Sequence, residues 1–189
     1  MTHSIANPAS FLVDNIALFE RLEISTGVLD LACGTGRNGL FLLSHNVPVI
    51  FADNNETSLQ SIAAALEAAG RDAKGSECWS IDFEADLSEG HNPLAGRVFD
   101  AVVVFNYLHR PLFPAIKAAV RPGGLLLYET FTVEQRRFGR PRNPDFLLKC
   151  GELGQTFADW ECIEEFEGEL SEPDRAVARI IARKPATCE

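Results

Sequence analysis

The chain has 189 residues, 46% of them hydrophobic and 23% charged, an ordinary balance for a single globular domain. Its formal net charge of -10 argues against a nucleic-acid partner, because binding to phosphates requires a positive surface. No apolar run reaches membrane-spanning length, residues 1–10 lack the pattern of a signal peptide, and the five cysteines form no CxxC pair. We therefore expect one cytoplasmic domain over residues 1–189, with reduced thiols, no metal and no membrane partner.

Helix and strand patterns alternate along the chain. Apolar spacing predicts a first helix over residues 11–22, with Asn7 as its cap and Pro8 at its first position. Further helices are expected over residues 37–45, 56–69 (closed by Gly70), 111–122 and 152–157. Strands are expected over residues 27–32, 48–52, 78–85, 99–105, 125–129, 160–166 and 176–183. This alternation predicts an α/β sheet covered by helices.

A glycine-rich loop follows the first predicted strand. Residues 34–39 read GTGRNG, a GxGxxG pattern whose glycines permit a tight turn and close approach of a ligand to backbone N–H groups. The next helix begins there and adds further donors. Asp53 lies about 20 residues further on, at the end of the second strand, where a carboxylate can accept hydrogen bonds from both ribose hydroxyls. The alternatives are a plain strand-to-helix turn and, for Asp53, a cap of the following helix.

Asp30 distinguishes between two cofactors that this pattern fits. NAD and S-adenosylmethionine would both suit the loop and Asp53. Asp30 lies inside the first strand, and a buried carboxylate requires a partner. The cationic methionine end of S-adenosylmethionine would supply one, whereas the first strand of a dinucleotide-binding domain has no such need. The chain is also too short for a separate hydride-transfer domain. We therefore favour S-adenosylmethionine.

A resemblance to a known family extends over nearly the whole chain. It is carried by residues 28–38 (VLDLACGTGRN), 51–53 (FAD), 84–87 (EADL), 99–104 (FDAVVV), 106–110 (NYLHR), 121–124 (RPGG) and 139–148 (GRPRNPDFLL). The sequence resembles class I S-adenosylmethionine-dependent methyltransferases, most closely their bacterial branch similar to tellurite-resistance methyltransferases. One position departs from the family pattern, because Ala32 replaces the usual first glycine of the loop motif. We expect its methyl group to be accommodated by a negative φ.

The resemblance implies a fold and a set of cofactor residues. The fold is a three-layer, Rossmann-like, doubly wound sheet of seven mostly parallel strands, the last of them antiparallel. Asp86 would accept a hydrogen bond from the adenine amino group, with Leu87 beside the ring. Residues 82–83 are a competing register, but Asp86 leaves the usual short approach to the fourth strand. The cofactor residues expected in full are Asp30, Ala32, Gly34, Gly36, Arg37, Asp53, Asn54, Asp86, Leu87, Phe105 and Asn106.

Tyr107 and His109 follow the fourth strand, at the edge of the sheet where ligands of α/β proteins bind. We expect both to contact the methyl acceptor and to act in catalysis, with His109 as the candidate base. The alternatives are a capping or packing role for His109 and a core or wall position for Tyr107. Residues 106–109 (NYLH) also lack the double proline of the Asn-Pro-Pro-Tyr motif in nucleic-acid amino-methyltransferases.

An arginine-rich segment follows the fifth predicted strand. Glycine and proline within residues 132–146 exclude one regular helix or strand. We expect a mobile lid over the acceptor, with Arg140 and Arg142 binding an anionic group. The alternative is a solvated loop whose arginines pair with surface acids. The predicted function is methyl transfer to a small molecule, with a catalytically silent S-adenosylmethionine-binding module and an NAD-dependent oxidoreductase as alternatives.

Overall fold

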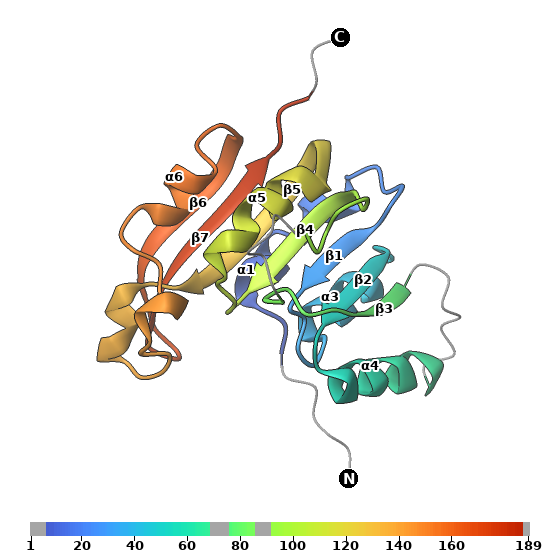
Figure 1. The fold of residues 1–189 in the computed structure, drawn as a ribbon, viewed down its shortest axis with the longest axis horizontal. Coiled ribbons are helices and arrows are strands. Elements are labelled where there is room, and N and C mark those ends of the chain that lie inside the picture. Colours follow the sequence, from blue (N-terminus) through green and yellow to red (C-terminus); the bar gives the residue numbers. More distant parts are fainter. Residues whose placement is uncertain (1–6, 69–75, 86–91, 187–189) are drawn as a thin grey trace.

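The computed structural model describes residues 7–68, 76–85 and 92–186. Its strands form one sheet in the order β3-β2-β1-β4-β5-β7-β6 (Figure 1). Their bounds are β1 Val28–Leu31, β2 Val49–Asp53, β3 Ser76–Ser80, β4 Phe99–Phe105, β5 Val120–Phe131, β6 Glu161–Leu170 and β7 Arg175–Arg183. The pairs from β3 to β5 are parallel, and β7 runs antiparallel to both β5 and β6. The predicted seven-stranded sheet with an antiparallel last strand is confirmed.

Helices cover both faces of the sheet. They are α1 Ser10–Asp14, α2 Ile16–Glu20, α3 Arg37–Ser44, α4 Glu56–Ala68, α5 Phe113–Ala119 and α6 Glu152–Thr156, with short 3-10 helices η1 Arg110–Leu112, η2 Val133–Arg137 and η3 Pro144–Phe146. Figure 1 shows α5 in front of the sheet and α1 and α3 behind it. None of the helices in the described parts of the chain is long and apolar enough to cross a membrane.

The two faces enclose two hydrophobic cores. Strand β4 contributes to both, because successive side chains of a strand point to opposite faces. Val102 and Val104 belong to the core beneath α5 and α6, whereas Val103 and Phe105 belong to the core beneath α1 to α4. All seven residues of β4 are buried, as its apolar sequence predicts for a central parallel strand. The result is the three-layer arrangement, with β4 and β1 at its centre.

The structure differs most from the sequence prediction at three elements. The first helix is broken at Asn15, whose side-chain amide donates to the Phe11 carbonyl at 3.1 Å, and it begins at Ser10 with Ala9 as its cap, so the cap at Asn7 is wrong. Strand β5 extends through its Pro-Gly-Gly sequence because Gly123 and Gly124 each form a backbone hydrogen bond with Lys184. Gly70 lies outside the described residues.

The third difference lies at β3, which ends at Ser80 rather than at residue 85. The chain turns there because the Asp82 carboxylate accepts a hydrogen bond from the Glu84 backbone N–H at 2.9 Å, and such local bonds compete with strand pairing. Phe83 is buried within this turn, in the core beneath α5. The turn therefore places Asp82 at the carboxyl end of β3.

Asp100 holds together the sheet at the end opposite to the carboxyl ends of the parallel strands. The sequence analysis did not identify this role. Its buried carboxylate accepts hydrogen bonds of 2.6–2.8 Å from the backbone N–H groups of Ser25, Thr26 and Gly27 and from Nε of Arg121. Burial alone would raise the pKa of Asp100, but these hydrogen bonds outweigh burial and lower it to about 2. The carboxylate thus ties the start of β1 to β4 and β5.

Candidate functional site

The loop between β1 and α3 is fastened to the end of β2. The Gly34 backbone N–H donates to Oδ2 of Asp53 at 2.8 Å, and Oδ1 of Asp53 accepts from the Asn55 backbone N–H at 2.9 Å. Gly34 has a φ of +54°, and a Cβ on it would meet nothing within 4 Å. The loop therefore presents backbone and open space at Gly34, which suits the approach of a ligand.

Gly36 has a different role from Gly34. It has a φ of +74° and precedes α3, and a Cβ on it would lie 2.6 Å from Cδ1 of Ile62. Glycine is needed here for the left-handed backbone and for close packing of the loop against α4. Gly36 lines none of the three cavities described below.

Asp30 is buried within β1, with only 2% of its surface exposed. Its Oδ2 accepts a hydrogen bond from the Gly39 backbone N–H at 2.8 Å. Burial raises the pKa of Asp30 to about 7, against the opposing effects of the Gly39 hydrogen bond and the positive charge of Arg37. The carboxyl therefore exchanges its proton near neutral pH, and a cation placed beside it would favour the ionised form.

Ala32 adopts a left-handed backbone, contrary to the sequence expectation. Its φ is +53°, so the expected negative φ is wrong. This conformation costs a residue with a Cβ about 1–2 kcal/mol, and surrounding contacts must compensate for that cost. Cys33 supplies one such contact, since its backbone N–H donates to the Ala52 carbonyl at 3.1 Å and holds the turn against β2.

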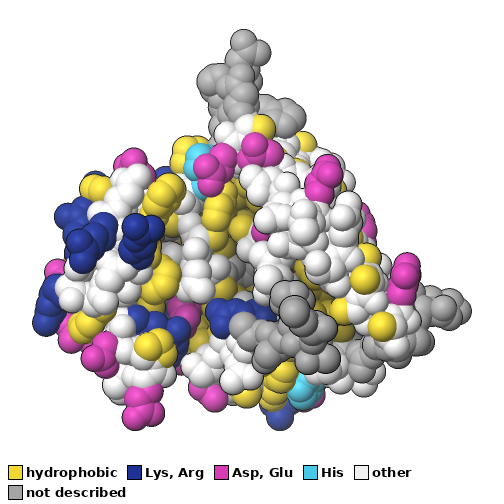
Figure 2. Space-filling view, turned by 90° about the horizontal axis from the view of Figure 1, so that it is seen from below, with side chains coloured by type: hydrophobic (Ala, Val, Ile, Leu, Met, Phe, Trp, Pro, Cys, Tyr) yellow, Lys and Arg dark blue, Asp and Glu magenta, His cyan; other side chains and the backbone are white. Residues whose placement is uncertain are grey.

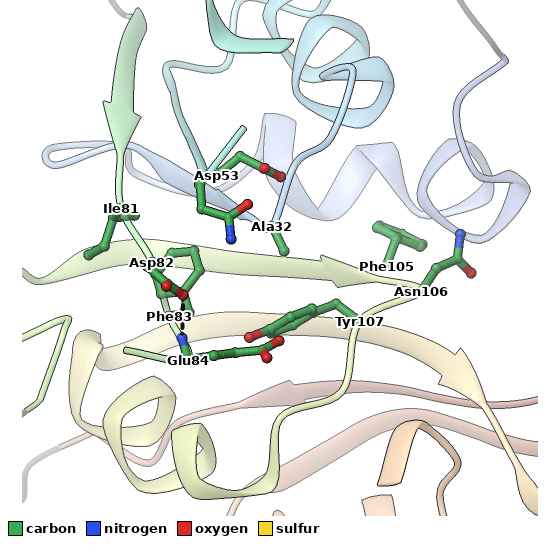
Figure 3. A pocket seen from close by; sticks show the side chains of 10 residues that line it. Ala32, Asp53, Ile81, Asp82, Phe83, Glu84, Phe105, Asn106 and Tyr107 are labelled. Carbon is green, nitrogen blue, oxygen red and sulfur yellow. Dashed lines mark hydrogen bonds between the residues drawn. The ribbon is translucent and has the colours of Figure 1, made fainter. Parts of the chain in front are cut away.

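Three cavities lie at the carboxyl ends of the parallel strands, where the topology of α/β sheets places ligand sites. The strand-end cavity, about 280 Å³ (Figure 3), is lined by Ala32, Asp53, Asn54, Ile81, Asp82, Phe83, Glu84, Phe105, Asn106 and Tyr107. The loop cavity, about 280 Å³, is lined by Asp30, Ala32, Cys33, Gly34, Thr35, Arg37, Asn38, Phe105 and Asn106. The outer cavity, about 400 Å³, is lined by Glu84, Asn106, Tyr107, Leu108, Phe131, Arg140, Pro141 and Phe146.

Asn106 lines all three cavities and is their common point. It follows β4 directly and has a φ of +56°, a left-handed conformation that asparagine tolerates better than most residues. Its backbone N–H donates to the Glu129 carbonyl at 2.9 Å, which fixes the turn against β5. A strained backbone held in place by its neighbours at a junction of cavities is typical of a functional site.

Tyr107 stands between the strand-end cavity and the outer cavity. Figure 3 shows its ring lying across the strand-end cavity, with the Glu84 side chain beside it. Its hydroxyl oxygen is buried. Burial raises the pKa of Tyr107, and the negative charge and hydrogen bonding of the neighbouring Glu84 carboxylate raise it further. The hydroxyl therefore stays protonated at neutral pH, with the Glu84 carboxylate beside it.

His109 lies apart from the cavities. It caps η1, and its Nε2 is buried without a hydrogen-bond partner in the described part of the chain. It lines none of the three cavities, so the structure brings Tyr107, but not His109, to them. Arg110, next to it, was not singled out from the sequence.

Arg110 holds the carboxyl-terminal end of the arginine-rich segment through hydrogen bonds. Its guanidinium donates to the carbonyls of Asp145 at 3.0 Å and Leu147 at 2.8 Å, and it pairs with Glu152 at 2.5 Å. Near the start of the segment, the buried Gln135 donates from Nε2 to the Arg140 carbonyl at 3.1 Å. The segment is irregular, as predicted; Gln135 ties its start to β7, and Arg110 of η1 holds its end.

The two arginines predicted to bind substrate differ in position. Arg140 lines the outer cavity, whereas Arg142 is exposed and lines none of the three. Arg137 pairs with Glu134 and Glu169 at the surface, as the alternative of a solvated loop predicts for this residue. Figure 2 shows hydrophobic side chains in the hollowed middle of this edge of the molecule and basic side chains gathered on the flank of residues 132–146.

Most of the predicted cofactor residues come together. Asp30, Gly34 and Arg37 line the loop cavity, Asp53 and Asn54 line the strand-end cavity, and Ala32, Phe105 and Asn106 line both. Asp86 and Leu87 lie outside the described residues. The sequence analysis missed Ile81 and Glu84, and it named residues 82–83 only as a competing register. The sequence carries no clear signal for them, because the apolar alternation continues through Phe83 to Ala85.

The fold and this site define a class, the Rossmann-like proteins with a glycine loop after the first strand and an acidic residue after the second. A family model described as "Tellurite resistance protein TehB" matches residues 17–187, and the chain belongs to this family. Within the described residues no group of three or more His, Cys, Asp or Glu side chains is arranged to hold a metal ion.

Individual proteins are also similar to this chain. TehB of Haemophilus influenzae, described as a probable S-adenosyl-L-methionine-dependent methyltransferase, is 29% identical over 160 residues, covering 81% of this chain and 53% of the relative. Hemagglutinin 1 of Eikenella corrodens is 30% identical over 141 residues, covering 72% of this chain and 44% of the relative. The crystal structure of H. influenzae TehB superposes with a TM-score of 0.74 at 23% identity, covering 93% of this chain and 62% of that one. The chain thus spans about half the length of the curated relatives it matches.

Proposed function

We propose that this protein binds S-adenosylmethionine in the strand-end and loop cavities and methylates a small molecule held in the outer cavity. The observation that carries the proposal is the meeting of three cavities at Asn106, at the carboxyl edge of the sheet. A cofactor there has one neighbouring space for its adenosine part, one for its methionine part and one for an acceptor. The name of the H. influenzae relative supports the same cofactor.

The residues present fit this cofactor. Asp53 retains lone pairs on both carboxylate oxygens after its two backbone hydrogen bonds, enough to accept from ribose hydroxyls. Asp30 and the open backbone at Gly34 line the loop cavity, where a carboxyl with a raised pKa can pair with an ammonium group. When bound, S-adenosylmethionine supplies a methyl group on a positively charged sulfur. The protein's residues orient it, exclude water and receive the acceptor.

Adenine recognition belongs to the acidic residues after β3. The sequence analysis favoured Asp86 because this register leaves the usual short approach to the fourth strand. In the structure β3 ends at Ser80, so Asp82 is the first acidic residue after the strand. Asp82 lines the strand-end cavity, and we propose it as the acceptor of a hydrogen bond from the adenine amino group, with Phe83 adjacent. Asp86 remains the alternative.

The outer cavity supports an enzyme over a silent cofactor-binding module. A module that only binds S-adenosylmethionine has no need of a second space beside it, whereas a methyltransferase must seat an acceptor there. Tyr107, which lines both spaces, is the residue we assign to contact the acceptor. The role of His109 as a base stays a prediction, since this side chain lines neither space.

Titration calorimetry tests the proposal. The purified protein should bind S-adenosylmethionine and its demethylated product, S-adenosylhomocysteine, and should not bind NAD under the same conditions. Binding of NAD in preference to both would replace the methyltransferase with an oxidoreductase. Methyl transfer to an acceptor in a cell extract, followed with methyl-labelled S-adenosylmethionine, separates an enzyme from a silent module.

A further inference from the structure

We infer that the acceptor is an amphipathic organic acid: a neutral, proton-bearing nucleophile at its inner end, an apolar body, and a carboxylate at its outer end. This inference rests on the proposed function and names the class of molecule that the outer cavity accepts. It differs from the simple anionic acceptor expected from the sequence, because it assigns opposite chemistry to the two ends of the cavity.

The size and the walls of the outer cavity indicate an apolar body. Its volume of about 400 Å³ falls in the range of sites for small organic ligands and far exceeds what a single inorganic oxyanion fills. Half of its eight lining residues are the apolar Leu108, Phe131, Pro141 and Phe146. Phe146 is 47% exposed although it is a large apolar side chain, which leaves its ring available to a ligand.

The inner end of the cavity is polar and negatively charged. Glu84, Asn106 and Tyr107 line both the outer and the strand-end cavities, so they stand between an acceptor and the cofactor. The Glu84 carboxylate is not paired with a basic side chain among the described residues. It would repel an oxyanion brought to the methyl group, whereas it attracts the proton of a hydroxyl, amine or other protic nucleophile.

Methyl transfer to such a nucleophile balances without another reactant. The nucleophilic atom forms a bond to the methyl carbon while the sulfur–methyl bond breaks and its electron pair returns to sulfur. The proton of the nucleophile passes to the Glu84 carboxylate and from there to solvent. Tyr107 remains protonated throughout, because burial and the neighbouring Glu84 raise its pKa, and its side chain forms part of the wall between the acceptor and the cofactor.

The outer end of the cavity carries the opposite charge. Among the described residues that line it, Arg140 is the one basic side chain, and the Arg140 backbone is held by Nε2 of Gln135. Gln135 is itself buried, and its Oε1 accepts from the Ala176 backbone N–H at 2.9 Å. No ion pair of Arg140 is found with the described acidic residues, so its guanidinium is available to a carboxylate, which it can bind with two parallel hydrogen bonds.

Calorimetry on the protein loaded with S-adenosylhomocysteine tests this inference with four probes. They are para-hydroxyphenylacetate, its amide, its methyl ether para-methoxyphenylacetate, and inorganic selenite. The hydroxy acid should bind about tenfold more tightly than the amide, because only the acid pairs with Arg140. It should also bind more tightly than the methyl ether, because only the hydroxyl donates to Glu84. Selenite should not bind.

Two variants test which residue binds each end of the hydroxy acid. Arg140→Gln should abolish the preference for acid over amide, and Glu84→Ala should abolish the preference for hydroxyl over methyl ether. Arg136→Gln is the matched control, since Arg136 is an exposed arginine of the same segment that lines none of the cavities, and it should change neither preference. Affinity for S-adenosylhomocysteine should be unchanged in Arg140→Gln.

The outcomes separate this inference from the proposed function. If S-adenosylhomocysteine itself does not bind, the proposed function fails. If it binds but the acid and the amide bind equally or neither binds, or if selenite binds instead, the amphipathic acceptor is overturned while the cofactor assignment stands. If the preference for the acid survives Arg140→Gln, the assignment of Arg140 to the carboxylate at the outer end is wrong. If the preference for the hydroxyl survives Glu84→Ala, the assignment of Glu84 to the nucleophile at the inner end is wrong.

Discussion

The Asp53 carboxylate accepts a hydrogen bond of 2.8 Å from the Gly34 backbone N–H, so the acidic residue after β2 and the glycine loop after β1 form one unit. The two residues are 19 positions apart in sequence and meet because β1 and β2 are parallel neighbours. The bond orients the carboxylate toward the strand-end cavity. It also couples the predicted ribose contact to the conformation of the loop.

Asp53→Ala should weaken binding of S-adenosylmethionine by about tenfold or more, since it removes charge-assisted hydrogen bonds worth about 1.5–3 kcal/mol each. Asp53→Asn should cause a smaller loss, because the amide retains one acceptor oxygen. Calorimetry measures both. Asp14→Asn, at an exposed position of α1, is the matched control and should bind normally. An Asp53→Ala variant with unchanged affinity would remove this residue from the site.

Binding of S-adenosylmethionine should strengthen as pH rises from 6 to 8. The folded pKa of Asp30 is about 7, above its ordinary value of 3.8, and a cationic ligand favours the carboxylate. Binding therefore releases a proton, and below pH 7 affinity should fall by up to about tenfold per pH unit. Asp30→Asn should flatten this dependence. Calorimetry in buffers of different ionisation enthalpy counts the proton, and a count of zero near pH 7 would contradict the pairing.

Asp30 should also govern stability in the absence of ligand. The pKa of Asp30 is higher in the folded protein than in the unfolded chain, so the protonated carboxyl stabilises the fold. This stabilisation is fully present below pH 3.8 and is lost as pH rises through about 7. Asp30→Asn should therefore melt at a higher temperature than the unmodified protein at pH 8. The asparagine can still accept from the Gly39 N–H. A lower melting temperature at pH 8 would show that the carboxylate is not destabilising.

Asp82→Asn should abolish the preference for adenosine over inosine cofactors, because the carboxylate accepts from the adenine amino group that inosine lacks. Competition between S-adenosylhomocysteine and S-inosylhomocysteine measures this preference. Asp86→Asn, a neighbouring acid of the same segment, is the comparison. If Asp86→Asn removes the preference and Asp82→Asn keeps it, the register favoured from the sequence is the correct one.

Ala32→Gly should stabilise the protein by up to about 1 kcal/mol. Glycine removes the cost of a left-handed φ of +53°, and the greater flexibility of glycine in the unfolded chain offsets part of the gain. Chemical denaturation measures the change, with Ala64→Gly as a control at an exposed position inside α4, where a loss is expected. Destabilisation by Ala32→Gly would show that packing of the methyl group outweighs the backbone strain.

The sequence predicted what depends on local pattern. The run of apolar residues at β4, the glycine loop and Asp53 each carry a periodicity or a spacing that a single sequence displays. It did not predict the end of β3, because Phe83 continues the alternation while Asp82 bonds to the Glu84 backbone and turns the chain. Nor did it predict Asp100 or Arg110, whose partners are distant in sequence and become neighbours only in the fold.

A crystal structure of the complex with S-adenosylhomocysteine is the most direct test of the proposed site. We predict the ribose hydroxyls on Asp53, the adenine amino group on Asp82, the methionine part beside Asp30, and the sulfur facing the outer cavity past Asn106 and Tyr107. A complex with the sulfur turned away from the outer cavity, or with the ligand outside the strand-end and loop cavities, would contradict the account.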